Sequence, residues 1–179
     1  MNREKVQIKV TDLLSSGVAK SEVFDRLSGE GASDRVLARA IASYADPRLL
    51  HENRSLIKIL VGIAYTQMII GFIVGFAAGA KFSLLAGLIF GGLTVLIAAI
   101  FVWGFSRNEV RVYNAYLILT LVQTPHQLGH FSSAPISTAI GLCIGFAVYA
   151  YVWYVRSRLF PDFAFISPRK ANGTYVFSG

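Results

Sequence analysis

The chain has 179 residues, of which 54% are apolar, and its formal net charge is +7. Its mean hydropathy is positive, and its apolar residues are concentrated after residue 55, which excludes a single ordinary soluble domain. Residues 1–55 carry nine Lys/Arg against eight Asp/Glu, whereas residues 56–179 carry eight against two. The N-terminal segment therefore lacks the positive charge that nucleic-acid binding requires, and we expect no nucleic-acid partner.

Residues 1–55 are predicted to form a small helical domain on the cytoplasmic side. In the first helix Val6 and Val10 share one face, and Gly17 is typical of a helix C-terminus. Ser21 and Ser33 are predicted to be the N-caps of two further helices. The predicted helices span about 45 residues, which can bury only a small apolar core. We therefore expect this domain to be stabilised by contact with the membrane surface, with the C-terminal tail or with a partner.

Residues 56–156 are predicted to cross a membrane four times. The runs 59–80, 83–105 and 136–155 contain no Asp or Glu and have the length that a bilayer core requires. The third crossing is less obvious, because its apolar part is short; it needs flanking polar residues to reach 108–127. The predicted fold class is an all-α integral membrane protein with four transmembrane helices.

The distribution of basic residues predicts which way the protein faces. With a cytoplasmic N-terminus, Lys81 would be the single basic residue outside. An excess of Lys and Arg on the cytoplasmic side is typical of membrane proteins, so we expect both termini inside, in a multi-pass protein of the cell inner membrane. The nine basic residues that would lie near the inner ends of the helices are Arg48, Arg54, Lys58, Arg107, Arg111, Arg156, Arg158, Arg169 and Lys170.

Three of the four predicted helices carry a ridge of small or polar residues at every fourth position. Small residues allow helix backbones to approach closely in a membrane, where no hydrophobic effect drives their association. These ridges are predicted to pack helices within the chain, or alternatively to join copies of it. The helix-packing candidates are Gln67, Gly71, Gly75, Gly79, Ser83, Gly87, Gly91, Ser137, Gly141 and Gly145.

The third predicted helix has a polar face instead of a small-residue ridge. Because polar groups are costly in hydrocarbon, this face is expected to point into the bundle. It would either hydrogen-bond to neighbouring helices or line a path for a solute or ion. The candidates for this face are Asn114, Tyr116, Thr120, Gln123 and Gln127.

The stretch QTPHQLGHFSSAP, residues 123–135, places His126 and His130 one helical turn apart. That spacing suits a shared metal ion, but the expected external side offers no Cys, Asp or Glu to complete a zinc site. We therefore expect neither a metal nor a cofactor. The favoured interpretation is an external turn, in which Thr124 and Pro125 begin a short new helix.

Residues 157–179 are predicted to form a cytoplasmic hairpin-like tail. Aromatic residues alternate on both sides of a turn near Asn172 and Gly173. Because two strands alone are marginal in water, the aromatic face should be covered by the N-terminal helices or lie among lipid headgroups.

The sequence offers no catalytic constellation. The serines near His126 lack a carboxylate that would orient a Ser-His pair, and no glycine loop is followed by Lys. We therefore expect a non-enzymatic membrane protein that acts through a protein partner or a second copy, as an accessory subunit, an assembly factor or a protective, immunity-type protein. The alternative is a small oligomeric channel or transporter with a path along the third helix.

Overall fold

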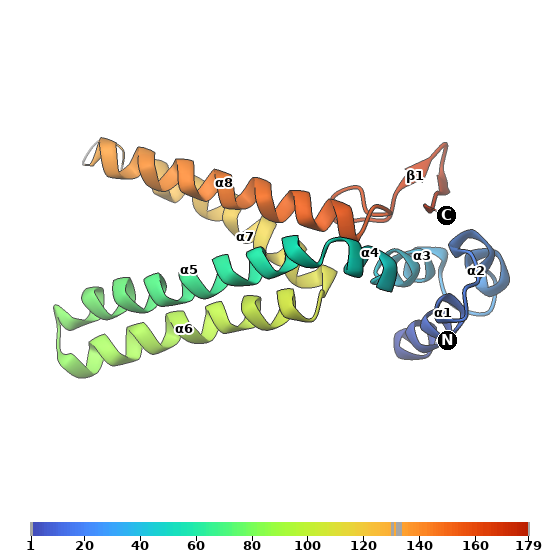
Figure 1. Cartoon of the computed structure of the whole chain (residues 1–179), viewed down its shortest axis with the longest axis horizontal. Coiled ribbons are helices and arrows are strands. Elements are labelled where there is room, and N and C mark those ends of the chain that lie inside the picture. The colour runs from blue at the N-terminus through green and yellow to red at the C-terminus, as the bar shows by residue number, and fades with distance from the viewer. Residues whose placement is uncertain (1, 130, 132–133, 179) are drawn as a thin grey trace. The chain divides into compact units, whose positions relative to one another are not determined.

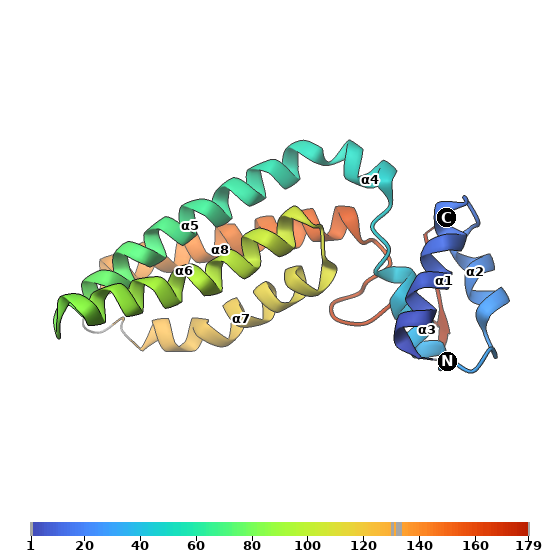
Figure 2. The same ribbon diagram turned by 90° about the horizontal axis from the view of Figure 1, so that it is seen from below.

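The computed structural model describes residues 2–129, 131 and 134–178, and for residue 127 it describes the backbone alone. Most of this part of the chain is helical, and it includes a small two-stranded sheet. The chain divides into two compact units. The terminal unit combines Met1–His51 with Arg156–Gly179, and the membrane unit is Glu52–Val155. Figure 1 and Figure 2 show the ribbon from two directions.

The N-terminal helices of the terminal unit are α1 (Arg3–Ser15), α2 (Lys20–Leu27) and α3 (Asp34–Ala42), and a short α4 (Pro47–Glu52) follows them. Gly17 follows the C-cap of α1, and its φ of 86° is accessible to glycine without strain. One apolar side of each of the first three helices meets in a shared core, formed by Val6, Val10, Leu14, Val23, Leu27, Leu37 and Ile41.

Of the two predicted N-cap residues, Ser33 takes the N-cap position and Ser21 does not. Helix α2 begins at Lys20, so Ala19 and not Ser21 takes the N-cap position. Ser33 does precede α3, but its side chain makes no capping hydrogen bond. The apolar spacing of each helix, rather than its cap residue, therefore accounts for where these helices lie.

The membrane unit contains α5 (Arg54–Ala80), α6 (Leu84–Ser106), α7 (Val110–Leu128) and most of α8 (Pro135–Leu159). Within the described residues, α5, α6 and α8 are long and apolar enough to cross a membrane. This confirms the prediction of a mainly helical chain with membrane-length helices. Helices α5 and α6 lie side by side along their length, joined by a tight turn (Figure 1 and Figure 2).

The turn between α6 and α7 depends on Asn108, which has a φ of 54°. Its backbone N–H donates to the carbonyl of Phe105, and the N–H of Glu109 donates to that of Gly104. This pair of bonds is the Schellman motif, in which a left-handed residue satisfies the last carbonyls of a helix. Asparagine tolerates this conformation better than other non-glycine residues, which explains why the chain reverses here.

Helix α7 continues through Pro125, whereas the sequence predicted that a new helix starts there. Proline removes one backbone donor, and near a helix end this costs little because few carbonyls still need a partner. The hydroxyl of Thr124 donates to the carbonyl of Thr120 at 2.8 Å. The prediction of a helix break was therefore wrong, and α7 reaches Leu128 as a single helix.

The tail forms the predicted hairpin, but with strands of two residues each. Strand β1 (Lys170–Ala171) pairs antiparallel with β2 (Thr174–Tyr175). Asn172 and Gly173 link them, and both have positive φ, as a type I′ turn requires. The tail belongs to the same compact unit as α1, α2 and α3.

Candidate functional site

Helices α5 and α6 approach each other closely at two glycines of α5. A Cβ built at Gly79 would lie 2.5 Å from the carbonyl oxygen of Ala86, and one at Gly75 would lie 3.0 Å from that of Phe90. No real side chain fits at the first of these distances. Gly79 therefore allows a backbone contact between α5 and α6 that alanine would prevent.

The glycines of α6 receive aromatic rings from α5. A Cβ at Gly87 would lie 3.1 Å from the ring of Phe76, and one at Gly91 would lie 2.9 Å from the ring of Phe72. The ridges of α5 and α6 therefore face each other, and large side chains of one helix fill the space that small residues of the other leave open.

Thr94 adds a polar contact to the same helix pair. Its hydroxyl oxygen lies 3.0 Å from the carbonyl oxygen of Gly71 on α5 and 2.7 Å from that of Gly91 on its own helix. Ser83, which the sequence placed in the ridge of α6, instead caps this helix by accepting a hydrogen bond from the N–H of Ala86 at 3.0 Å. Ser83 thus fixes where α6 starts.

The corresponding ridge of α8 makes no such contact in the described chain. A Cβ at Gly141 or Gly145 would have no atom of another element within 4 Å. Ser137 is exposed, and its hydroxyl donates to the carbonyl of Ala134 at 3.2 Å. The ridges of α5 and α6 thus pack against each other, whereas the ridge of α8 packs against no other element of the described chain.

The polar face of α7 meets α5 through a pair of side chains. The amide of Gln67 donates to the hydroxyl of Tyr116 at 3.0 Å, and this hydroxyl lies 3.3 Å from the amide oxygen of Gln67. The ring of Tyr116 packs edge-on against Phe101 and Phe105 of α6, with centroids 5.4 Å and 5.7 Å apart. Gln67 therefore links α5 to α7.

The remaining candidates on α7 are less well connected. The hydroxyl of Thr120 donates to the carbonyl of Tyr116 at 2.9 Å. Asn114 is half-buried, and its side-chain oxygen has no hydrogen-bond partner among the described residues. Gln123 is exposed, and the side chain of Gln127 lies outside the described residues. Among the residues of the predicted polar face, Tyr116 therefore makes the described side-chain hydrogen bond to another helix.

The predicted histidine pair is only half described. His126 is an exposed residue near the end of α7, and His130 lies outside the described residues. Among the residues that the structure describes, no group of three or more His, Cys, Asp or Glu side chains is placed to hold a metal ion.

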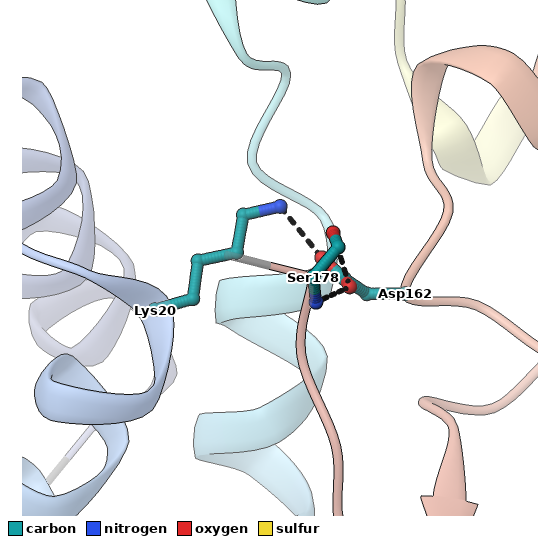
Figure 3. Close-up of polar contacts among 3 residues, drawn as sticks. All are labelled: Lys20, Asp162 and Ser178. Atoms are coloured by element: carbon teal, nitrogen blue, oxygen red, sulfur yellow. Dashed lines mark hydrogen bonds and ion pairs between the residues drawn. The ribbon is translucent and has the colours of Figure 1, made fainter.

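The terminal unit contains a polar site that the sequence analysis missed (Figure 3). Asp162 is 3% exposed, and its Oδ2 accepts a hydrogen bond from Nζ of Lys20 at 2.6 Å. Its Oδ1 accepts two more, from the backbone N–H of Ser178 at 2.5 Å and from the hydroxyl of that residue at 2.7 Å. One buried carboxylate thus joins the start of α2 to the end of the tail.

A signal for this site was present in the sequence. Asp162 is one of two acidic residues after residue 55, and it lies within a strongly aromatic segment. A lone carboxylate in such a segment is costly to bury unless a cation and further donors compensate for the lost hydration. What the sequence does not show is that the cation, Lys20, comes from the other end of the chain.

Arg156 organises the other end of the tail. Its buried guanidinium donates to the carbonyl of Phe165 and lies 5.6 Å from the centre of the Phe163 ring. The guanidinium of Arg39 donates to the carbonyl of Ile166 at 3.1 Å. Two arginines thus hold consecutive carbonyls of the loop that leads to the hairpin.

Comparisons with known proteins leave the site to be interpreted from its own geometry. The chain matches no protein-family model, and searches of curated proteins and of solved structures give no match either.

Proposed function

We propose that this chain is a four-span protein of the cell inner membrane that acts by associating with another membrane protein or a second copy of itself, rather than by catalysis. Accessory, assembly and protective roles all use association of this kind. The four-span topology and the association have separate support.

The composition of the terminal unit supports four spans. The packing of α1, α2 and α3 with the tail in one unit favours a position of both segments on the same side of a membrane, and such a position needs an even number of crossings. Helices α5, α6 and α8 account for three. Helix α7 has 19 residues, which at about 1.5 Å per residue approaches the thickness of a bilayer core. It supplies the fourth crossing.

The cytoplasmic position of both ends is supported by charge. Basic residues lie near the start of α5 and the end of α8, which adjoin the terminal unit in sequence, as at Lys58 and Arg158. Arg107 lies in the turn between α6 and α7, which four spans would place on the same side. Lys81 is the one basic residue in the turn between α5 and α6. Positive residues remain preferentially on the cytoplasmic side during insertion, so this pattern favours a cytoplasmic terminal unit.

The observation that carries the association is the open ridge on α8. The ridge glycines of α5 and α6 lie in the interface between these two helices, whereas a Cβ at Gly141 or Gly145 would meet no atom within 4 Å in the described part of the chain. Helices in lipid associate through small residues that permit close packing. The ridge of Ser137, Gly141 and Gly145 thus suits a transmembrane helix of a partner or of a second copy.

The alternative of a channel along α7 has weaker support. Its most central polar groups, those of Tyr116 and Gln67, hydrogen-bond to each other, and Thr120 and Thr124 donate to carbonyls of their own helix. Side chains paired in this way act as contacts between helices. Groups engaged in this way are less able to replace the hydration of a moving ion.

Cross-linking in native membranes, followed by purification in mild detergent, tests the association. We expect wild-type protein to yield a complex with a second copy or another protein, and Gly141→Ile with Gly145→Ile to lose it. Gly62→Ile is the matched control, because a Cβ at Gly62 also meets open space but lies outside the ridge. Recovery of monomer alone from the wild type, or equal complex from all three proteins, would reject the proposed role of the ridge.

A further inference from the structure

One face of α2 receives the tail. Lys20 and Phe24 lie one helical turn apart on this face. Nζ of Lys20 reaches Asp162, and the ring of Phe24 packs against Tyr175 and Phe177, with centroids 5.7 Å and 5.6 Å apart. Phe177 also packs against the shared apolar core. The last residues of the tail therefore cover part of the core of the N-terminal helices.

The tail has little structure that would hold it there independently. Its strands have two residues each, and a two-stranded hairpin is marginal in water even when longer. Outside the hairpin, the N–H of Val176 donates to the carbonyl of Arg169 at 3.2 Å, and the N–H of Arg169 donates to that of Asp162 at 2.8 Å. The position of residues 170–178 thus depends on their contacts with Asp162 and with α2.

Asp162 links all these contacts. Its two carboxylate oxygens bind different segments: Oδ2 accepts a hydrogen bond from Lys20 of α2, and Oδ1 accepts hydrogen bonds from Ser178 of the tail (Figure 3). A buried carboxylate that loses one set of donors keeps its desolvation cost without the compensating bonds. Loss of either set should therefore weaken the other.

We propose that residues 170–178 form a strap that opens and closes as one element, that Asp162 is its latch, and that opening it uncovers the apolar face of α2 around Phe24. The strap thus controls access to the core that α1, α2 and α3 share. This inference concerns the terminal unit alone and does not depend on the partner of α8.

Hydrogen–deuterium exchange of the full chain in lipid nanodiscs tests the strap. In Asp162→Asn, which keeps the shape but loses the charge, exchange of residues 20–27 and 170–178 should rise together by about tenfold or more. Lys9→Met is the matched control, because the ion pair of Lys9 with Glu30 is exposed, with side chains 52% and 45% accessible. Exchange of both segments should stay unchanged in that variant.

A second pair of variants tests the latch without changing the buried carboxylate. Ser178→Asp places a second carboxylate beside Asp162 and should open the strap, whereas Ser178→Asn keeps a neutral donor and should leave it closed.

A third variant exchanges the charges of the ion pair, with Lys20→Asp and Asp162→Lys together. It should fail to restore the protection of residues 20–27 and 170–178, because the N–H of Ser178 would then face a cation.

The measurements can overturn the proposal in several ways. If residues 170–178 exchange faster while residues 20–27 do not, the tail is not a cover for α2. If Ser178→Asp and Ser178→Asn behave alike, or if the charge exchange restores protection, Asp162 is not a latch of the kind described. If α1 and α3 lose protection to the same extent in every opening variant, the unit unfolds as a whole and no separate strap exists.

Discussion

Gly79 and Gly75 show how single residues set the distance between two membrane helices. In lipid, van der Waals contact replaces the hydrophobic effect as the force between helices, so a difference of one methyl group matters. At Gly79 the space for that methyl is occupied by the backbone of Ala86, which cannot rotate away. At Gly75 the nearest backbone atom, the carbonyl oxygen of Phe90, is farther away.

Gly79→Ala should therefore destabilise the α5–α6 pair by about 1–3 kcal/mol, the usual cost of overpacking a tight contact. Gly92→Ala is the control, because a Cβ at Gly92 has no neighbour within 4 Å. Thermal denaturation in detergent, followed by size-exclusion chromatography, measures both variants. Equal midpoints for Gly79→Ala and the wild type would mean that α5 and α6 are not in this close contact.

At the scale of elements, helix ends rather than helix centres account for the differences between sequence and structure. The long apolar runs predicted α5, α6 and α8 well, because an uninterrupted run of this length has few other stable structures. The turn after α6 depends instead on one left-handed residue, Asn108. That turn sets where α7 begins.

Replacement of Asn108 tests this turn. Asn108→Val places a β-branched residue at a φ of 54° and should cost about 1–2 kcal/mol, whereas Asn108→Gly should be tolerated. The midpoint of thermal denaturation in detergent should fall for valine and not for glycine. A valine variant as stable as the wild type would show that α6 ends differently.

The candidate contacts could be predicted only in part, for a physical reason. Periodicity indicates that residues share a face of one helix, but it does not indicate which helix they meet. The four-residue spacing groups Gln67 with the glycine ridge of α5, yet Gln67 bonds to Tyr116 of α7, which belongs to the predicted polar face. The pairing of Lys20 with Asp162 is beyond such patterns altogether, because 141 residues separate the two in the printed sequence.

At the scale of the whole molecule, the terminal unit links the fold to membrane topology. Its two segments come from opposite ends of the chain, and Lys20 and Asp162 form their ion pair within it. If both segments lie on one side of the membrane, the intervening chain must cross it an even number of times. The topology is therefore testable without any knowledge of function.

Labelling of single cysteines with an impermeant maleimide measures this topology, in a background where the exposed Cys143 is replaced by Ala. In intact cells Phe82→Cys, in the α5–α6 turn, should react. Ser106→Cys and Ala171→Cys should react only after the membrane is opened, because they are expected on the cytoplasmic side. Labels that place Ser106 and Ala171 on opposite sides would contradict a fourth crossing by α7.

The discontinuous terminal unit also has a consequence for the order of events during translation. Helices α1, α2 and α3 are synthesised before α5–α8, but Phe177, which packs against their core, is synthesised after all of these helices. The apolar side of the N-terminal helices therefore stays incompletely covered until α5–α8 have been synthesised. A chain that stops within α8 would lack Phe177 and would leave this apolar surface uncovered, the kind of exposed surface that makes incompletely folded chains prone to aggregate.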